Sequence, residues 1–193
     1  MTAGALNMSH TAAHYAILWT VLIATGAGSL YLIRYNTLRY GIMFILSSIT
    51  AALFCVMFFR MGFYRYALPM KEVLPAAAVS FSFLAILLIR YRPEKNTFPF
   101  FFISITAVFS IEVLLKDYAG FIRFHNGWDY WDSYSLYWLF LRLMGFVGEF
   151  FIPRAYRTPI RTNTKGYWLL FIAMLIYACF GVYILNKGWA EIL

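Results

Sequence analysis

The sequence predicts an all-α polytopic membrane protein, a single bundle of about six transmembrane helices. Apolar runs near the length of about 20 residues that a membrane-spanning helix needs recur about six times in the 193 residues. Hydrophobic residues make up 63% of the chain and charged residues only 12%, whereas roughly 25% of charged residues is usual in a soluble domain. The runs are continuous rather than alternating between apolar and polar residues, which favours helices over the strands of a membrane barrel.

The expected spans follow one another with short connections and no separate domain. They are 15–33, 40–59, 73–90, 97–115, 135–152 and 167–185. Arg34 follows the first span, Arg60 the second, and Pro153 the fifth. Pro75 falls in the opening turn of the third span, where its missing N–H costs little. Asn96 precedes the fourth span as its expected cap.

The distribution of Lys and Arg predicts the orientation of the bundle in the cell membrane. The connections after the first, third and fifth spans hold nine basic residues, and the segments on the opposite side hold six. Because basic residues favour the cytoplasmic side, both termini are expected to be extracytoplasmic. The same residues lie at membrane edges, so the net charge of +8 indicates contact with anionic membrane lipids, and nucleic acid is not an expected partner.

The segment between the fourth and fifth spans is unusually rich in aromatic and polar residues. One interpretation is an interfacial loop, because Trp and Tyr favour the headgroup level and Asn126-Gly127 favours a tight turn. In that interpretation Asp132 or Ser133 caps the fifth span.

The alternative is a site in this same segment. His125, Asn126, Trp128 and Trp131 would bind a ligand between rigid aromatic rings. His125 could also act as an acid or base together with Asp129 or Asp132, as in a membrane enzyme that modifies lipids.

The chain has three histidines, which are the candidate metal ligands. His10 and His14 lie four residues apart before the first span, on the same predicted side as His125. No HExxH or CxxC pattern accompanies them, so neither a metal ion nor a cofactor is expected.

Three charged residues fall inside predicted spans, where each costs roughly 2.5 to 3.5 kcal/mol near a helix centre. They are Glu112, Arg142 and Glu149. The first two lie toward the same side of neighbouring spans, so we expect them to form an ion pair that joins the helices. A polar path lined by all three, as in a small transporter or channel, is the alternative. Gly28 and Gly148 are expected where helices approach closely.

The stretch GFIRFHNGW (120–128) resembles a loop of a family of small multi-pass membrane proteins from spore-forming Firmicutes. The matching positions extend from Glu112 through this loop to Trp131 and Arg142, whereas DYWDSY and the later GEFFIPRAYR depart from the family pattern. The resemblance implies a bacterial membrane protein. It implies no reaction, since the family has no assigned activity.

Taken together, these patterns favour a non-enzymatic membrane protein that binds a ligand or serves a structural role through its extracytoplasmic HNGW loop. A protein partner or a second copy of the chain is compatible with this hypothesis. The transporter and the lipid-modifying enzyme stay open as alternatives.

Overall fold

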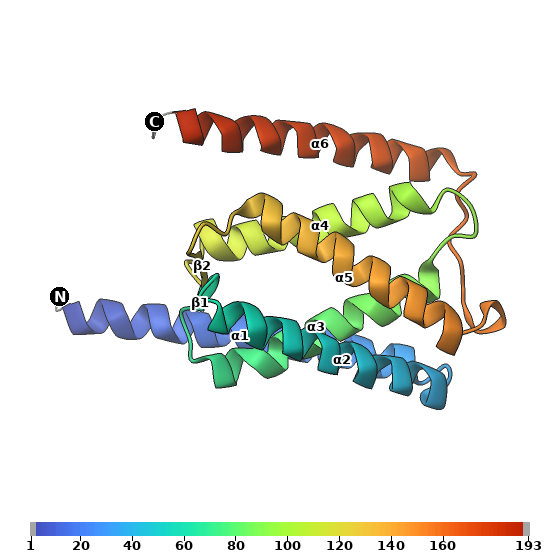
Figure 1. Ribbon diagram of the computed structural model, residues 1–193, viewed down its shortest axis with the longest axis horizontal. Helices are drawn as coiled ribbons and strands as arrows, with labels where there is room; N and C mark the ends of the chain where they lie inside the picture. The colour runs from blue at the N-terminus through green and yellow to red at the C-terminus, as the bar shows by residue number, and fades with distance from the viewer. Residues whose placement is uncertain (1–2, 191–193) are drawn as a thin grey trace.

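Six helices run back and forth along one long axis in the computed structural model, which describes residues 3–190 and the side chains of residues 11–184 (Figure 1). The helices are α1 (Ala3–Ile33), α2 (Thr37–Arg60), α3 (Met70–Tyr91), α4 (Thr97–Asp117), α5 (Tyr130–Phe151) and α6 (Lys165–Ala190). Two short strands, β1 (Tyr64–Tyr66) and β2 (Ile122–Phe124), and the 3-10 turn η1 (Arg154–Tyr156) lie in the connections.

The predicted all-α class is confirmed, and the predicted number of spans is confirmed in part. Within the described residues five helices are long and apolar enough to cross a membrane: α1, α2, α3, α4 and α6. Helix α5 is of similar length but carries Asp132, Arg142 and Glu149. Two helices begin well before the expected spans: α1 begins at Ala3 and α5 at Tyr130. Helix α3 begins at Met70 rather than at residue 73, so Pro75 lies inside it and not in its first turn.

The connections separate into two ends of the bundle. The start of α1, the end of α6 and the two strands lie at one end, here called the sheet end (Figure 1). The connections after α1, α3 and α5 lie at the opposite end, here called the basic end because the nine Lys and Arg residues counted above lie there. Both described ends of the chain thus lie on the same side of the bundle.

Helices α1, α2 and α3 pack together, α5 packs against α2, α3 and α4, and α6 packs on α4. Their shared core includes Tyr40, Ile86, Phe101 and Phe140, all almost fully buried. Small residues allow two close approaches, as the sequence predicts. A Cβ atom on Gly28 would overlap the Phe83 ring, and a Cβ atom on Gly148 would overlap Ile89.

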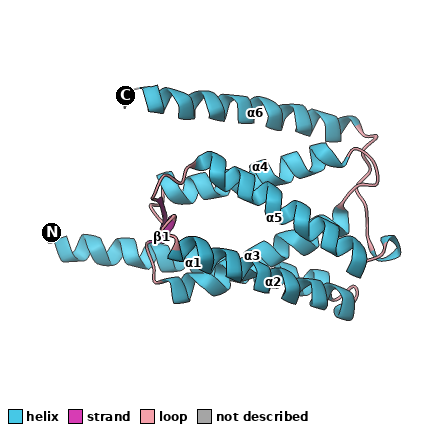
Figure 2. Cartoon of the chain, in the orientation of Figure 1, coloured by secondary structure: helices cyan, strands magenta, loops and turns pink. Residues whose placement is uncertain are grey.

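A two-stranded antiparallel sheet, which the sequence did not predict, ties two connections together at the sheet end (Figure 2). Tyr64 pairs with Phe124 and Tyr66 with Ile122. Because β1 follows α2 and β2 follows α4, the sheet fixes the end of α4 relative to the α1–α3 group. This position matters for the cavity described below.

Backbone and side-chain hydrogen bonds close the basic end. The segment after α5 runs beside the end of α3, where the Thr158 and Ile160 amides donate to the carbonyls of Arg90 and Tyr91. Asn96 is the N-cap residue of α4, as expected, but it has a positive φ and makes no side-chain cap bond.

Candidate functional site

A cavity of about 440 Å³ lies among helices α1 to α5 and the two strands, toward the sheet end. This volume falls within the roughly 300 to 1,000 Å³ that is typical of small-molecule sites. Its walls are almost entirely apolar, with contributions from every one of these elements. Apolar lining residues include Leu18, Phe54, Phe58, Phe81, Phe121 and Leu136. Such a lining suits a hydrocarbon chain rather than a polar metabolite.

The cavity reaches the surface between α1 and α4. The lining residues Thr20 and Ala24 of α1 are exposed, and Ile111 of α4 is 55% exposed. The opening lies here because α1 packs mainly on α3 while α4 packs on α5 and α6. It lies on the side of two apolar helices, away from the loops at either end.

Glu112 is the only Asp, Glu, Lys, Arg or His residue among those that line the cavity. It is only 4% exposed. The Tyr64 hydroxyl donates a hydrogen bond to its Oε1 atom at 3.2 Å. Its Oε2 atom is buried and has no hydrogen-bond partner within the described structure. The Tyr137 hydroxyl lies near the same carboxyl. A buried carboxyl oxygen without a partner is costly, so this is where a ligand would contribute most.

The Tyr64 bond is the last of a series of hydrogen bonds that lead to the carboxyl. The indole N–H of Trp128 donates to Ser133 Oγ at 2.9 Å, and Ser133 Oγ lies 2.6 Å from the Tyr64 hydroxyl. An indole N–H can only donate, and each hydroxyl has one hydrogen. Because the Ser133 oxygen accepts from Trp128 and the Tyr64 hydrogen goes to Glu112, the Ser133 hydrogen goes to Tyr64. Every hydrogen in the series therefore points toward Glu112.

The Tyr64 hydroxyl keeps its hydrogen. Burial, and then the neighbouring Glu112 carboxyl, raises the pKa of Tyr64 well above its usual value. Tyr64 consequently remains a donor at physiological pH, and the Glu112 carboxyl is the acceptor at the end of the series.

The HNGW segment forms a tight turn before α5, as one of the two interpretations of the sequence predicted. Asn126 and Gly127 both have positive φ, and the Trp128 amide donates to the His125 carbonyl at 3.0 Å, the arrangement of a type I′ turn. The Asn126 side-chain amide donates to the Met61 carbonyl. His125 is exposed and does not line the cavity.

The two tryptophans of this segment lie in different surroundings. The Trp128 ring stacks on Phe63 with centroids 4.8 Å apart and also contacts Phe58 and Tyr64. The Trp131 side chain is 49% exposed. Of the predicted binding residues in the loop, Trp128 thus joins the hydrogen-bond series to Glu112, whereas Trp131 stays at the surface.

The two aspartates that the enzyme hypothesis pairs with His125 form a capping box. The Asp129 side chain accepts from the amides of Trp131 and Asp132, and the Asp132 side chain accepts from the Asp129 amide. The predicted cap at Asp132 or Ser133 is therefore wrong, because the helix begins at Tyr130 with Asp129 as its cap. Both carboxylates accept hydrogen bonds from backbone amides at the start of the helix. Helix capping therefore accounts for the two aspartates at these positions.

The two candidate metal ligands whose side chains the structure describes, His14 and His125, lie in different surroundings. His14 bonds to the Ala119 carbonyl through Nε2 and packs against Phe121, while His125 is exposed in the turn. The side chain of His10 lies outside the described residues. Among the residues that the structure describes, no group of three or more His, Cys, Asp or Glu side chains could hold a metal ion.

The predicted ion pair between Glu112 and Arg142 is wrong. Arg142 lies over the Phe101 ring, 5.1 Å from its centroid, and its side chain is exposed. Glu149 forms an ion pair with Arg92 of the connection after α3. Glu112 thus lies toward the sheet end while Glu149 is paired at the basic end, and neither Arg142 nor Glu149 lines the cavity.

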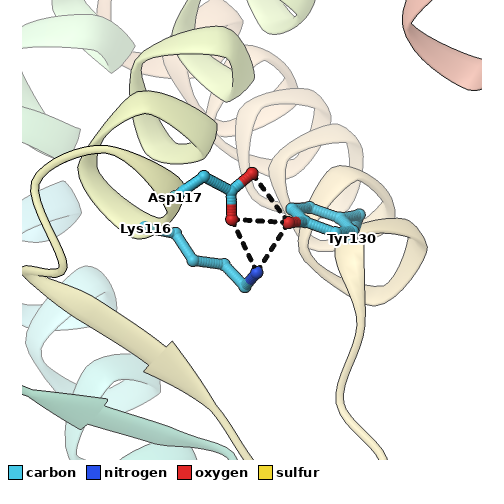
Figure 3. Close-up of polar contacts among 3 residues, drawn as sticks. All are labelled: Lys116, Asp117 and Tyr130. Atoms are coloured by element: carbon cyan, nitrogen blue, oxygen red, sulfur yellow. Dashed lines mark hydrogen bonds and ion pairs between the residues drawn. The ribbon is translucent and has the colours of Figure 1, made fainter. Parts of the chain in front are cut away.

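The wall of the cavity next to Glu112 is fixed by polar contacts between the end of α4 and the start of α5 (Figure 3). Lys116 Nζ donates to the Tyr130 hydroxyl at 2.6 Å and to Asp117 Oδ1 at 2.8 Å. The Tyr130 hydroxyl in turn donates to the Asp117 carboxylate. Sequence analysis did not predict these contacts, because Tyr130 lies 13 residues beyond Asp117 and nothing local marks the two as partners.

The fold and the site define a helical membrane protein with an apolar cavity that contains one buried acidic side chain. The chain matches no protein-family model, no curated protein and no solved structure. The resemblance of the GFIRFHNGW segment to the Firmicutes family therefore stays a hypothesis, and what the protein does must be argued from the site itself.

Proposed function

We propose that the protein is a non-enzymatic integral membrane protein that binds the hydrocarbon chain of a lipid-like molecule in the cavity among α1 to α5. The observation that carries this proposal is the apolar cavity of about 440 Å³ with its opening between two apolar helices. Because a helix side within a bilayer faces lipid rather than water, a molecule already dissolved in the membrane is the natural occupant. The exposed position of His125 and the capping role of Asp129 favour binding over catalysis.

The proposed arrangement has six membrane crossings, because α5 crosses the membrane in addition to the five helices named above. Its buried residues extend from Ser133 to Gly148, over more than half of its length, and it packs on α2, α3 and α4. Its charged residues have neighbours, since Glu149 pairs with Arg92 and Arg142 lies over Phe101. The basic end faces the cytoplasm and the sheet end faces outward, in keeping with the excess of basic residues.

Cysteine labelling in intact cells tests this orientation. In a background where the free Cys55 and Cys179 are replaced by alanine, Tyr118→Cys at the sheet end should react with an impermeant thiol reagent. Thr37→Cys and Asn163→Cys, both at exposed positions of the basic end, should react only after the membrane is permeabilised. Labelling of the two basic-end cysteines in intact cells together with protection of Tyr118→Cys would invert the proposed orientation.

Photolabelling tests chain binding. We expect a hexadecane probe that carries a diazirine, added to the protein in lipid nanodiscs, to label peptides that contain cavity-lining residues. Ala77 lines the cavity and is half-buried, so Ala77→Phe should fill part of the space and reduce this labelling several-fold. Ala107→Phe is the control, because Ala107 is exposed on α4 outside the cavity lining. Labelling spread evenly over the lipid-facing helices and unchanged by Ala77→Phe would show that the cavity binds no chain.

A further inference from the structure

The polar end of the cavity differs chemically from the rest, and this difference concerns the head group of the ligand. Elsewhere on the cavity wall, Thr25 and Ser80 have hydrogen-bond partners of their own. Thr25 donates to the Val21 carbonyl and lies 3.3 Å from the Ser80 hydroxyl. Glu112 has one bonded oxygen, Oε1, and one buried oxygen without a partner, Oε2. A ligand that lies in the cavity with its polar end at Glu112 would meet Oε2.

We propose that the ligand carries a hydrogen-bond donor at its polar end, a hydroxyl or an amine, which donates to Glu112 Oε2. The inference rests on the proposed function, because it assumes that a hydrocarbon chain occupies the cavity. It follows from the direction of the hydrogen-bond series, in which Trp128, Ser133 and Tyr64 each donate toward the carboxyl. When Glu112 is ionised, its Oε2 atom offers only lone pairs, and a donor on the ligand would satisfy them.

The same chemistry argues against an anionic head group. A carboxylate or phosphate placed beside Glu112 would bring a charge into an apolar space with no cation among the lining residues, where an unpaired buried charge is strongly disfavoured. Lys116 lies one turn further along α4, but its ammonium group is bonded to Asp117 and Tyr130 (Figure 3). The site therefore selects neutral or cationic donor heads.

The experiment compares four molecules with one chain and different ends: hexadecanol, hexadecylamine, palmitate and hexadecane. Binding to the protein in nanodiscs is followed through the rise in Tm, since a ligand that binds the native state stabilises it. We expect half-maximal stabilisation by hexadecanol or hexadecylamine at a concentration about tenfold lower than for palmitate or hexadecane, as one additional buried hydrogen bond provides. A stronger effect of the alcohol identifies a neutral head, and a stronger effect of the amine a cationic one.

Glu112→Gln is the decisive variant. With the amide oxygen accepting from Tyr64, the amide N–H₂ takes the position of Oε2 and donates instead of accepting. The preference for donor heads should disappear, and palmitate should bind at least as well as hexadecanol. Ser80→Ala is the control, because Ser80 lines the cavity and its hydrogen-bond partner is Thr25 rather than Glu112, and it should keep the preference of the unmodified chain.

Photolabelling by the diazirine hexadecane separates failure of this inference from failure of the proposed function. Labelling of the cavity in Glu112→Gln shows that the variant is folded with the cavity intact. If the cavity is labelled but all four molecules bind equally, or if Glu112→Gln leaves the preference unchanged, the donor-head inference is wrong and chain binding stands. If the cavity is not labelled in the unmodified chain, chain binding itself fails.

Discussion

Trp128→Ala should lower the thermal stability of the protein in detergent by about 6 °C or more. Loss of a packed Trp ring costs about 3 to 5 kcal/mol, and about 1 kcal/mol shifts the Tm of a chain of this size by roughly 2 to 4 °C. The ring contacts Phe58, Phe63 and Tyr64. Its removal also takes the indole donor away from Ser133, which is fully buried, so a polar group loses its partner at the same time.

Trp131→Ala is the matched control for this prediction. It removes the same side chain three residues later, at a position that is 49% exposed, and surface changes are usually within about 0.5 kcal/mol. Differential scanning fluorimetry of the two purified variants decides the matter. Equal losses of Tm would mean that the aromatic cluster around Trp128 contributes nothing particular to stability.

Gly148→Leu should destabilise the contact between α3 and α5. Even a Cβ atom at this position would overlap the Ile89 side chain, so the two helices must move apart or Ile89 must leave its place. Overpacking of this kind costs about 1 to 3 kcal/mol, and helix association in membranes depends on such small residues. The measurement is the Tm in detergent together with the yield of monodisperse protein.

Gly26→Leu makes the same change where a Cβ atom would have no neighbour within 4 Å. Leu is a better helix former than Gly by roughly 0.5 to 1 kcal/mol, so this variant should be neutral or slightly stabilised. A Gly148→Leu protein with unchanged Tm would show that α3 and α5 tolerate a wider separation than the structure describes.

The helices could be predicted from the sequence alone because each is a long apolar run with a polar boundary. It was insufficient for β1 and β2, since strands of three residues are too short to show a period of two. The sheet depends on pairing between Tyr64 and Phe124, which lie far apart in the sequence, and no local pattern indicates such a contact. The turn at Asn126-Gly127 was predictable because its φ angles are those that Asn and Gly favour.

The error over Glu112 and Arg142 has a specific physical origin. With α5 expected to begin at residue 135, Arg142 is only seven residues from its start, but the Asp129 cap places the helix start at Tyr130. At 1.5 Å per residue, Arg142 then lies about 18 Å from the start of α5. Glu112 lies only about 8 Å from the end of α4 by the same rise, so the two side chains are at different depths of the bundle. The true neighbours of Glu112 were missed because Tyr64 comes from a distant connection and Ser133 was assigned a capping role.

The opening between α1 and α4 has a consequence for how affinity must be expressed. A molecule that enters from the side of the bundle is counted by its mole fraction in the bilayer, not by its concentration in water. Occupancy should then remain constant when buffer volume changes and fall when unlabelled lipid is added at fixed ligand. Dissociation constants measured for this protein would be comparable only at equal lipid-to-protein ratios, and a scarce membrane component could fill the cavity while being undetectable in solution.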